Sequence, residues 1–175
     1  MTDAVGTRHA TTPEIVELPE RHAAVVGIDG RLDELPRLMG EAFGLSAETI
    51  GESGAVIAGP PFARYYGFGE RIQAEAGFPF SGTLVPTDRV RETILPGGRL
   101  VTTTHVGSYE ELTQAWDRAA AWMREHALTS TGAPWECYLT GPDEPGPPIT
   151  EIFWPLDDHR PSPRPRAGCP RTGTP

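Results

Sequence analysis

The feature that most restricts the fold of this chain is an internal repeat, in which two stretches follow the same pattern of predicted elements. The first stretch, about residues 15–80, contains HAAVVGIDG, a helical segment, AGPPFARYYG and QAEAGFPF in that order. The second, about residues 89–156, contains RLVTTTHVG, a helical segment, TGAPWECYLTG and ITEIFWPL. Each stretch therefore predicts a module of strand, helix, strand and strand.

The helix of the second repeat is predicted from about Tyr109 to His126, because apolar residues recur there at three- and four-residue spacing. Ser108 followed by Glu111 has the pattern of a capping box, in which the two side chains bond amide groups of the first turn. The strand segments are rich in β-branched and apolar residues, as strands inside a sheet prefer. A proline occupies the same place in GFPF and FWPL, which is tolerated near a strand end or at a sheet edge.

The helix of the first repeat is predicted from about Leu32 to Phe43, with Pro36 acceptable only in its opening turn. The long segment after it, residues 45–59, has room for another short helix. Together these elements predict an α+β protein of two strand-helix-strand-strand modules, with the helices packed on one side of an antiparallel sheet.

Composition changes at both ends of the chain. Residues 1–12 are small and polar, and residues 157–175 are rich in proline and arginine, so we expect both ends to be disordered. The folded domain is expected over residues 13–156. Cys137 and Cys169 are too few for a disulfide framework or a four-cysteine zinc site.

Net charge and hydropathy limit the classes of binding partner and the cellular location that we expect. The net charge of -9 predicts no nucleic acid partner, because a hold on phosphates needs clustered Lys and Arg. No apolar run approaches the roughly 20 residues of a membrane span, and the N-terminus lacks a signal pattern. We therefore expect a soluble cytoplasmic protein with no membrane partner, and the sequence leaves a protein partner open.

Glu136 places a carboxylate in the middle of a predicted apolar strand, GAPWECYLTG. Because side chains alternate along a strand, the residues around it divide into two sets. We expect the apolar set to face the helices and the polar set to point at the opposite face of the sheet. The sets are Trp135, Cys137 and Leu139 on one side, and Glu136 and Tyr138 on the other.

The first repeat carries Ala63 and Tyr65 at the positions that match Glu136 and Tyr138. If the repeats pack about a pseudo-twofold axis, two tyrosines and one carboxylate approach one another. The symmetry is then broken at the charge, which only the second repeat carries.

The motifs of this chain resemble a known family. The segments HVGSYEEL, GAPWECYLT and TEIFWPL, with GPPFARYYG and EAGFP before them, are similar to the GyrI-like small-molecule-binding domain. That domain is also the effector-binding part of AraC-type and MerR-type multidrug regulators. The resemblance covers nearly all of residues 13–156, and it implies a cleft between the modules that takes bulky, often aromatic and cationic, compounds.

The resemblance also implies roles for individual residues. The acidic residue on the family's central strand matches Glu136, and its HxGxY segment matches His105, Gly107 and Tyr109. Some stand-alone relatives hydrolyse cyclopropane-bearing genotoxins, with that glutamate involved in the attack of water. The expected catalytic residues, for a hydrolase only, are Glu136 and Tyr109. The expected ligand-binding residues are Glu136, Tyr138, Tyr65, Tyr109, His105, Trp116 and Phe153.

Three functions stay open. The first is a stand-alone protein that binds hydrophobic or cationic drugs or metabolites, for sequestration or resistance. The second is a hydrolase that opens cyclopropane-bearing electrophiles with Glu136 as acid or base. The third is a protein-interaction module such as a gyrase modulator. The sequence shows no Ser-His-Asp order, phosphate loop or metal cluster, so we expect no cofactor and no metal.

Simpler roles are also open for the residues singled out. Glu136 could lie on a solvated sheet face, Tyr109 could pack at a helix start and His105 could be a hydrogen-bonded strand-end residue. Glu75 and Glu151 match one another in the two repeats, and we expect them to be solvated or paired with arginines such as Arg64.

Overall fold

The computed structural model describes residues 11–141 and 143–157, so most of the two ends that we expected to be disordered lie outside the described residues. The elements in chain order are β1 (Glu14–Leu18), β2 (Arg21–Gly30), η1 (Leu32–Glu34), α1 (Leu35–Glu52), β3 (Val56–Ile57), β4 (Phe62–Gly67), β5 (Ile72–Ser81), β6 (Arg91–Leu95), β7 (Gly98–Val106), η2 (Tyr109–Glu111), α2 (Leu112–Glu125), β8 (Trp135–Tyr138) and β9 (Ile149–Pro155).

The strands form one antiparallel sheet in the order β1-β7-β9-β8-β4-β5-β2-β6, and the short β3 pairs with β5. The first module consists of β2, α1, β4 and β5, and the second of β7, α2, β8 and β9. The modules meet in the middle of the sheet, where Ala63 of β4 lies opposite Glu136 of β8. The predicted α+β fold with two modules is therefore confirmed.

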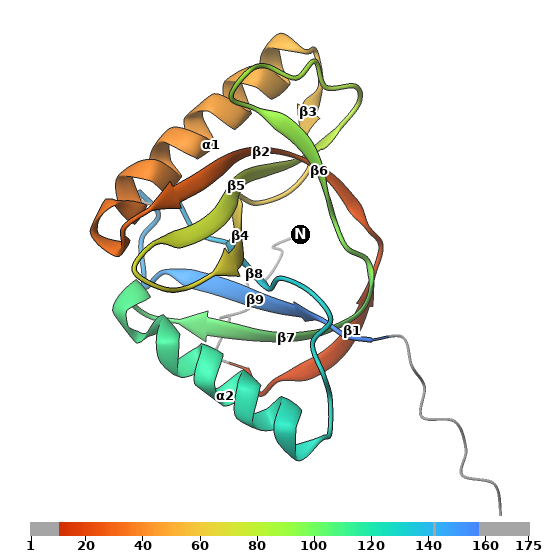
Figure 1. Cartoon of the computed structure of the whole chain (residues 1–175), viewed down its shortest axis with the longest axis vertical. Coiled ribbons are helices and arrows are strands. Elements are labelled where there is room, and N and C mark those ends of the chain that lie inside the picture. The colour runs from red at the N-terminus through yellow and green to blue at the C-terminus, as the bar shows by residue number, and fades with distance from the viewer. Residues whose placement is uncertain (1–10, 142, 158–175) are drawn as a thin grey trace, which may run out of the picture.

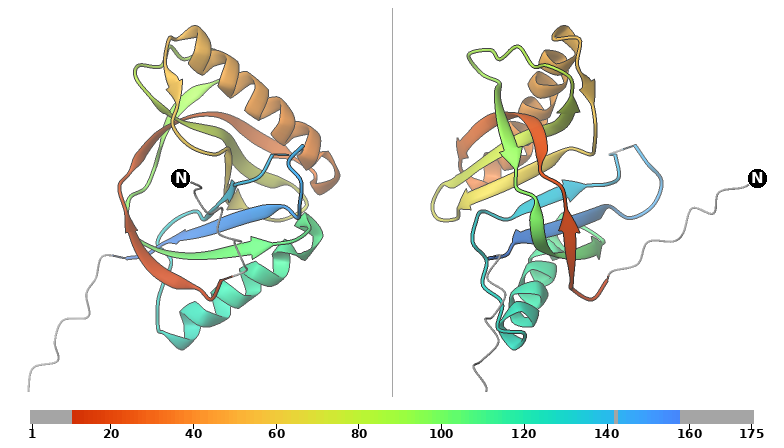
Figure 2. Two further views of the ribbon diagram at one scale, coloured as in Figure 1. Left: turned by 180° about the vertical axis from the view of Figure 1, so that it is seen from behind. Right: turned by 90° about the vertical axis from the view of Figure 1, so that its right-hand side faces the viewer.

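The sheet curls into a ring because each end strand crosses to the other module (Figure 1). β1 leads into β2 but pairs with β7, and β6 leads into β7 but pairs with β2. The two bends do not interrupt the register: Leu18 lies opposite Gly98, and three residues further along Arg21 lies opposite Leu95. Figure 2 shows the two continuous segments, β1 into β2 and β6 into β7, crossing the side of the ring. The sequence patterns did not predict β1 or β6.

The strands between the two end strands, β1 and β6, bury side chains on both faces of the curled sheet. The inner face encloses one apolar cluster, and the outer face is covered by α1 and α2, each over its own module (Figure 1). The buried members of the inner cluster are Ala23, Val25, Phe62, Leu95, Leu100, Trp135, Cys137 and Phe153.

The side chains of β8 point to the opposite faces from those predicted. Trp135 and Cys137 lie inside the ring, with Leu139 packed against the same cluster, whereas Glu136 and Tyr138 lie on the helix side. The alternation itself was predicted correctly. Its direction was wrong because the curl buries the inner face as well, so an apolar set of side chains does not identify the face that meets a helix.

The first helix is longer than predicted. α1 begins at Leu35, with Pro36 in its first turn, and continues to Glu52 instead of ending at Phe43. Its second half packs on the sheet through Ser46, Thr49 and Ile50, which are buried. The segment that could have held a separate helix therefore continues α1.

The start of the second helix also differs in detail from its prediction. A 3-10 turn, η2, precedes α2, and the Ser108 side chain makes no capping bond. Instead the backbone carbonyl of Ser108 accepts a hydrogen bond from the Glu111 amide at 3.2 Å. The capping-box prediction was wrong because the tighter turn satisfies this amide through the backbone.

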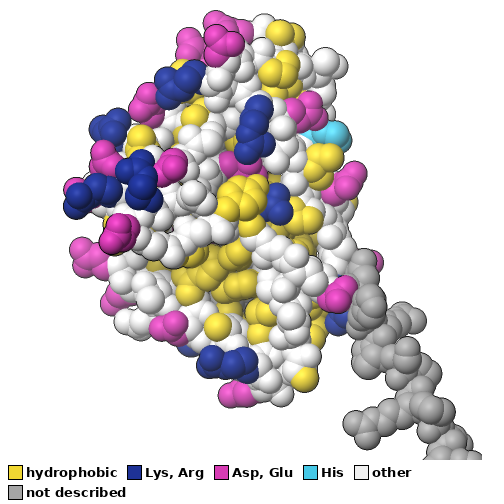
Figure 3. Space-filling view, viewed as in Figure 1, with side chains coloured by type: hydrophobic (Ala, Val, Ile, Leu, Met, Phe, Trp, Pro, Cys, Tyr) yellow, Lys and Arg dark blue, Asp and Glu magenta, His cyan; other side chains and the backbone are white. Residues whose placement is uncertain are grey.

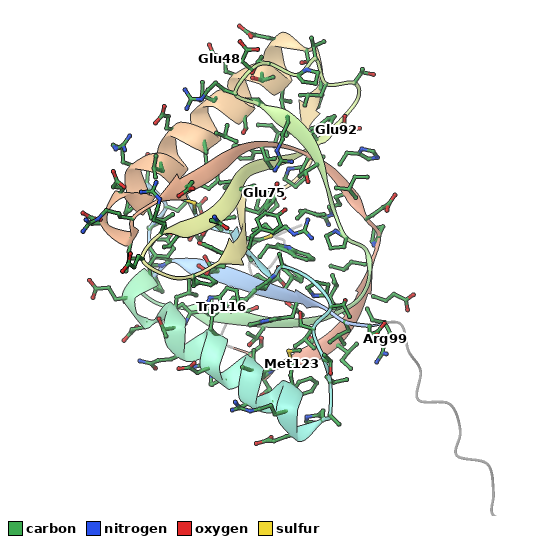
Figure 4. The ribbon with its side chains drawn as sticks, in the orientation of Figure 1. Glu48, Glu75, Glu92, Arg99, Trp116 and Met123 are labelled. Atoms are coloured by element: carbon green, nitrogen blue, oxygen red, sulfur yellow. The ribbon has the colours of Figure 1, made fainter. Side chains whose placement is uncertain are left out.

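Glu75 lies on β5 inside the ring of strands (Figure 4). Its side chain is fully buried and its carboxylate lies 2.5 Å from the guanidinium of Arg91 and 3.8 Å from that of Arg64. The Tyr66 hydroxyl donates to it at 2.8 Å. Of the two alternatives predicted for Glu75, solvation or pairing with arginines, the pairing is confirmed. None of the helices in the described ranges combines the length and apolar composition that crossing a membrane requires.

Candidate ligand-binding site

Glu136 lies on the outer face of β8, between the two helices, and only 5% of it is exposed. Three side chains donate hydrogen bonds to its carboxylate. The indole Nε1 of Trp116, on α2, donates to Oε1 at 2.7 Å. The hydroxyls of Tyr138 and Tyr65 donate to Oε2 at 2.7 and 3.1 Å. Figure 4 shows Trp116 on the side of α2 that faces the strands.

The two tyrosines are related by the repeat. The Tyr65 amide donates to the carbonyl of Pro134 at 3.0 Å, and the Tyr138 amide donates to that of Pro61 at 2.9 Å. These paired bonds place a pseudo-twofold axis between Ala63 and Glu136, which lie opposite each other. The predicted approach of two tyrosines to one carboxylate is confirmed, and their hydroxyl oxygens lie 3.2 Å apart.

Burial and hydrogen bonding act in opposite directions on this cluster. Burial raises the pKa of Glu136, while the hydrogen bonds from Tyr138, Trp116 and Tyr65 oppose that rise. Burial and the charge of Glu136 also raise the pKa values of both tyrosines above the usual range. Both hydroxyls therefore stay protonated and act as donors to the carboxylate.

Aromatic rings surround the carboxylate and its donors. Phe68 stacks on Tyr65 with ring centroids 5.1 Å apart, and it meets the edge of Trp116 at 6.4 Å. Phe43 of α1 meets Tyr138 edge to face at 6.0 Å. Rings from both modules thus form an aromatic cage over one buried negative charge.

The HxGxY segment lies at one side of this cage. His105 is buried, and its Nε2 donates to the Ser108 carbonyl at 3.0 Å. Gly107 has a φ of 144°, and a Cβ there would lie 2.9 Å from the Glu111 carboxylate, so glycine suits this turn. Tyr109 is 54% exposed and meets Tyr138 edge to face at 6.0 Å. Tyr109 therefore lies at the cage, while His105 makes its hydrogen bond to the backbone of the turn.

Phe153 does not join this cluster. It lies inside the ring of strands, stacked on Trp135 with centroids 5.4 Å apart. The sequence analysis proposed Phe153 as an aromatic ligand contact beside Glu136, but Phe153 belongs to the opposite face of the sheet.

Two cage residues were missed by the sequence reasoning. The sequence predicted Phe43 only as the end of the first helix. It gave no role to Phe68, although the glycines on either side, Gly67 and Gly69, indicate a short turn that exposes the ring between them. In residues 11–141 and 143–157, no group of three His, Cys, Asp and Glu side chains is arranged to hold a metal ion.

The sequence of this chain matches a model of the GyrI-like small molecule binding domain over residues 11–157. The chain belongs to this family. The match spans both modules and includes every residue of the cage. Among proteins with curated descriptions, none matches the chain.

Several solved structures share the fold. EcmrR matches in a DNA complex, with a TM-score of 0.72, 18% identity and coverage of 83% of this chain and 57% of that chain. The EcmrR C-terminal domain alone has a TM-score of 0.68 and 17% identity, and the match covers 85% of this chain and 98% of that domain. A hydrolase from Listeria innocua has a TM-score of 0.60 and 16% identity, with coverage of 83% of this chain and 92% of the hydrolase. SAV2435 bound to tetraphenylphosphonium has a TM-score of 0.57 and 9% identity, with coverage of 85% of this chain and 95% of SAV2435.

The likeness to EcmrR contradicts our exclusion of nucleic acid. We excluded it from the net charge of -9, yet a chain with this fold has been solved in a complex with DNA. The net charge is that of this chain alone, and this chain spans little more than half of the EcmrR chain in that complex. An acidic composition is therefore no ground for separating GyrI-like domains from DNA-bound proteins.

Proposed function

We propose that this GyrI-like domain binds bulky aromatic cations in the cage around Glu136, as a cytoplasmic protein that sequesters or senses them. The observation that carries the proposal is a carboxylate that is 5% exposed and held between rings from both modules. SAV2435, which shares the fold, was solved with tetraphenylphosphonium, a cation of this kind.

The charge of Glu136 favours a cation because it is only partly compensated. Its three hydrogen-bond donors are neutral groups, since the tyrosines stay protonated and an indole carries no charge. Two cations near the sheet, Arg64 and Arg91, are instead engaged with Glu75 on the inner face. The charge of His105 also lowers the pKa of Glu136, after the three hydrogen bonds. A cationic guest would therefore meet a carboxylate whose hydrogen-bond donors are all neutral, and each ring face in contact with it would add about 0.5–2 kcal/mol.

The guest would enter by displacing the rings that are most exposed. Phe68 is 67% exposed and Tyr109 is 54% exposed, whereas Tyr65 beneath Phe68 is buried. Phe68 lies in the short turn between β4 and β5, with glycine on either side. A flat guest could take the place of Phe68 on Tyr65, which would keep the stacking contact and bring the positive charge toward Glu136.

Isothermal titration calorimetry with two probes tests this proposal. Tetraphenylphosphonium carries the charge, and triphenylphosphine oxide offers similar rings without it. We expect Glu136→Gln to weaken tetraphenylphosphonium binding by about tenfold or more, which corresponds to about 1.4 kcal/mol, and to leave the neutral probe nearly unchanged.

Glu75→Gln is the matched control, because Glu75 is also a buried carboxylate next to the central strands but lies on the inner face. Its binding of tetraphenylphosphonium should equal that of the unchanged protein under conditions where both are folded. Equal losses in the two variants, or no loss in Glu136→Gln, would refute the role of the cage.

We infer hydrolysis of strained electrophiles as the second candidate, and the raised pKa of Glu136 is the observation that favours it. A carboxylate with a raised pKa is suited to take a proton from water, and Tyr109 beside Tyr138 offers an exposed hydroxyl to a leaving group. The three donors already on the carboxylate oppose this role, because a water would have to replace one of them. A Listeria innocua protein of this fold is described as a hydrolase.

Mass spectrometry separates the two candidates. The protein is incubated with a cyclopropane-bearing alkylating agent, and the ring-opened product is followed over time. A hydrolase would give many turnovers, with loss of activity in Glu136→Gln and a smaller loss in Tyr109→Phe. Stoichiometric binding without product would exclude the hydrolase and leave ligand binding as the remaining candidate.

A further inference from the structure

The inside of the curled sheet contains a cavity, on the face of β8 opposite to Glu136. Its volume is about 330 Å³, within the range of small-molecule pockets. Figure 3 shows hydrophobic side chains gathered in the middle of the molecule, within the ring of strands, and charged side chains mostly around the outside. The side chains that define the cavity's chemistry are Leu18, Leu100, Leu139, Trp135, Phe153 and Thr102.

Thr102 is the one feature of this lining that packing does not explain. It is 6% exposed, yet its hydroxyl has no hydrogen-bond partner among the residues that the structure describes. Leaving a buried hydroxyl unpaired costs about 1–3 kcal/mol. A valine of nearly the same shape would avoid that cost, so the unpaired hydroxyl of this lining residue points to a polar atom that is supplied from outside the protein.

The lining selects against charge in a guest. Burial raises the pKa of the Cys137 thiol to about 12, so this wall stays neutral. The charged residues of the cavity, Glu14, Arg21 and Glu151, are at least partly exposed and carry both signs, whereas the side chains of Trp135, Leu100 and Phe153 are buried. A charged guest in the interior would lose its hydration without gaining a buried partner charge.

We propose that the interior of the curled sheet is a second ligand site, which binds a compact uncharged molecule with an aromatic or alicyclic body and one hydroxyl or carbonyl bonded to Thr102. This site is separate from the cage. Glu136 and its donors lie on the helix side of the sheet, and Thr102, Trp135 and Phe153 lie on the inner side. The proposal does not depend on what the cage binds.

The test uses 2-naphthol and naphthalene, which share a bicyclic body and differ only in the hydroxyl. Binding to the full chain is followed by calorimetry and by the indole N–H resonances in ¹H–¹⁵N spectra. Trp135 lines the cavity and Trp116 lies in the cage, so their signals report the two faces separately. We expect 2-naphthol to shift the Trp135 signal and to leave that of Trp116 in place.

Thr102→Val is the central variant, since it removes the hydroxyl and keeps the shape. Because the hydroxyl has no partner in the described residues, the variant should be at least as stable as the parent. We expect it to weaken 2-naphthol binding about fivefold, the value of one ordinary hydrogen bond, and to leave naphthalene binding unchanged. Val16→Trp, which fills the cavity from β1, should abolish binding of both probes.

Two results would overturn the proposal. One is the absence of saturable binding of 2-naphthol up to its solubility limit. The other is binding that persists in Thr102→Val at full strength and disappears in Glu136→Gln, because the probe would then occupy the cage. If Val16→Trp fails to fold, the comparison of the two probes in Thr102→Val still decides the question.

Discussion

Replacing Trp116 by phenylalanine separates the hydrogen bond to Glu136 from the packing of the aromatic cage. The change removes the indole N–H that lies 2.7 Å from Oε1 and keeps a ring on α2. Glu136 would then retain only the two tyrosine donors, both on Oε2. One oxygen of a nearly buried carboxylate would lose the hydrogen bond that the indole supplies.

The expected cost depends on the ionisation of Glu136. A hydrogen bond to a charged group contributes about 1.5–3 kcal/mol and one to a neutral group about 1 kcal/mol, so we expect a loss near 2 kcal/mol when Glu136 is ionised and about half of that when it is protonated. The indole bond lowers the pKa of Glu136, so its removal raises that pKa further. Ionisation of a carboxylate with a raised folded pKa costs stability as pH rises from its unfolded to its folded value. The difference between variant and parent must therefore grow with pH.

Urea unfolding from pH 5 to pH 8 measures this difference. Trp122→Phe is the matched control, because Trp122 is a partly buried tryptophan on the same helix whose ring stacks on His126 and not on the cage. Its loss of stability should not vary with pH in the same way. A double-mutant cycle with Glu136→Gln should return a coupling energy of about 1–2 kcal/mol. Identical pH profiles for Trp116→Phe and Trp122→Phe would refute the reasoning.

Three other outcomes follow from the same structure. Tetraphenylphosphonium affinity should fall as pH decreases through the raised pKa of Glu136, because protonation removes the charge, and calorimetry should find a flat profile in Glu136→Gln. Tyr109→Ala should change the unfolding free energy by less than about 0.5 kcal/mol, since the side chain is exposed, and should still weaken tetraphenylphosphonium binding. Gly77→Ala should destabilise the protein by about 3 kcal/mol, because its Cβ would lie 1.9 Å from the Ala24 carbonyl oxygen, whereas Gly40→Ala on open helix surface should stabilise it by about 1 kcal/mol in denaturant unfolding.

The approach of Tyr65 and Tyr138 to Glu136 could be predicted from the sequence, because it depends on which positions of the two repeats are equivalent. Once Tyr65 was aligned with Tyr138, and Ala63 with Glu136, a pseudo-twofold axis was enough to bring the polar groups together. No knowledge of side-chain packing was needed. The second helix was predictable because its apolar residues recur at helical spacing from Leu112 to Met123.

The features that were not predicted depend on the curl of the sheet. An apolar strand face usually meets a helix, but here the inner face buries Trp135 and Phe153 against other strands, so the rule chose the wrong side. The strands β1 and β6 were missed because each pairs with a segment more than 60 residues away, which no local pattern reveals. Phe68 was missed because a turn residue has no periodicity to mark its contacts.

The position of Glu136 on the pseudo-twofold axis has a consequence for how such a protein can arise. Two identical half-length chains that paired through this central strand would place the same residue opposite its own copy at the axis. A glutamate there would face a second glutamate on the neighbouring strand, and two buried like charges at that distance repel strongly. Joining the halves in one polypeptide allows alanine on one side and a carboxylate on the other. A single buried carboxylate at this point is therefore possible in a fused chain and is disfavoured in a symmetric dimer of its halves.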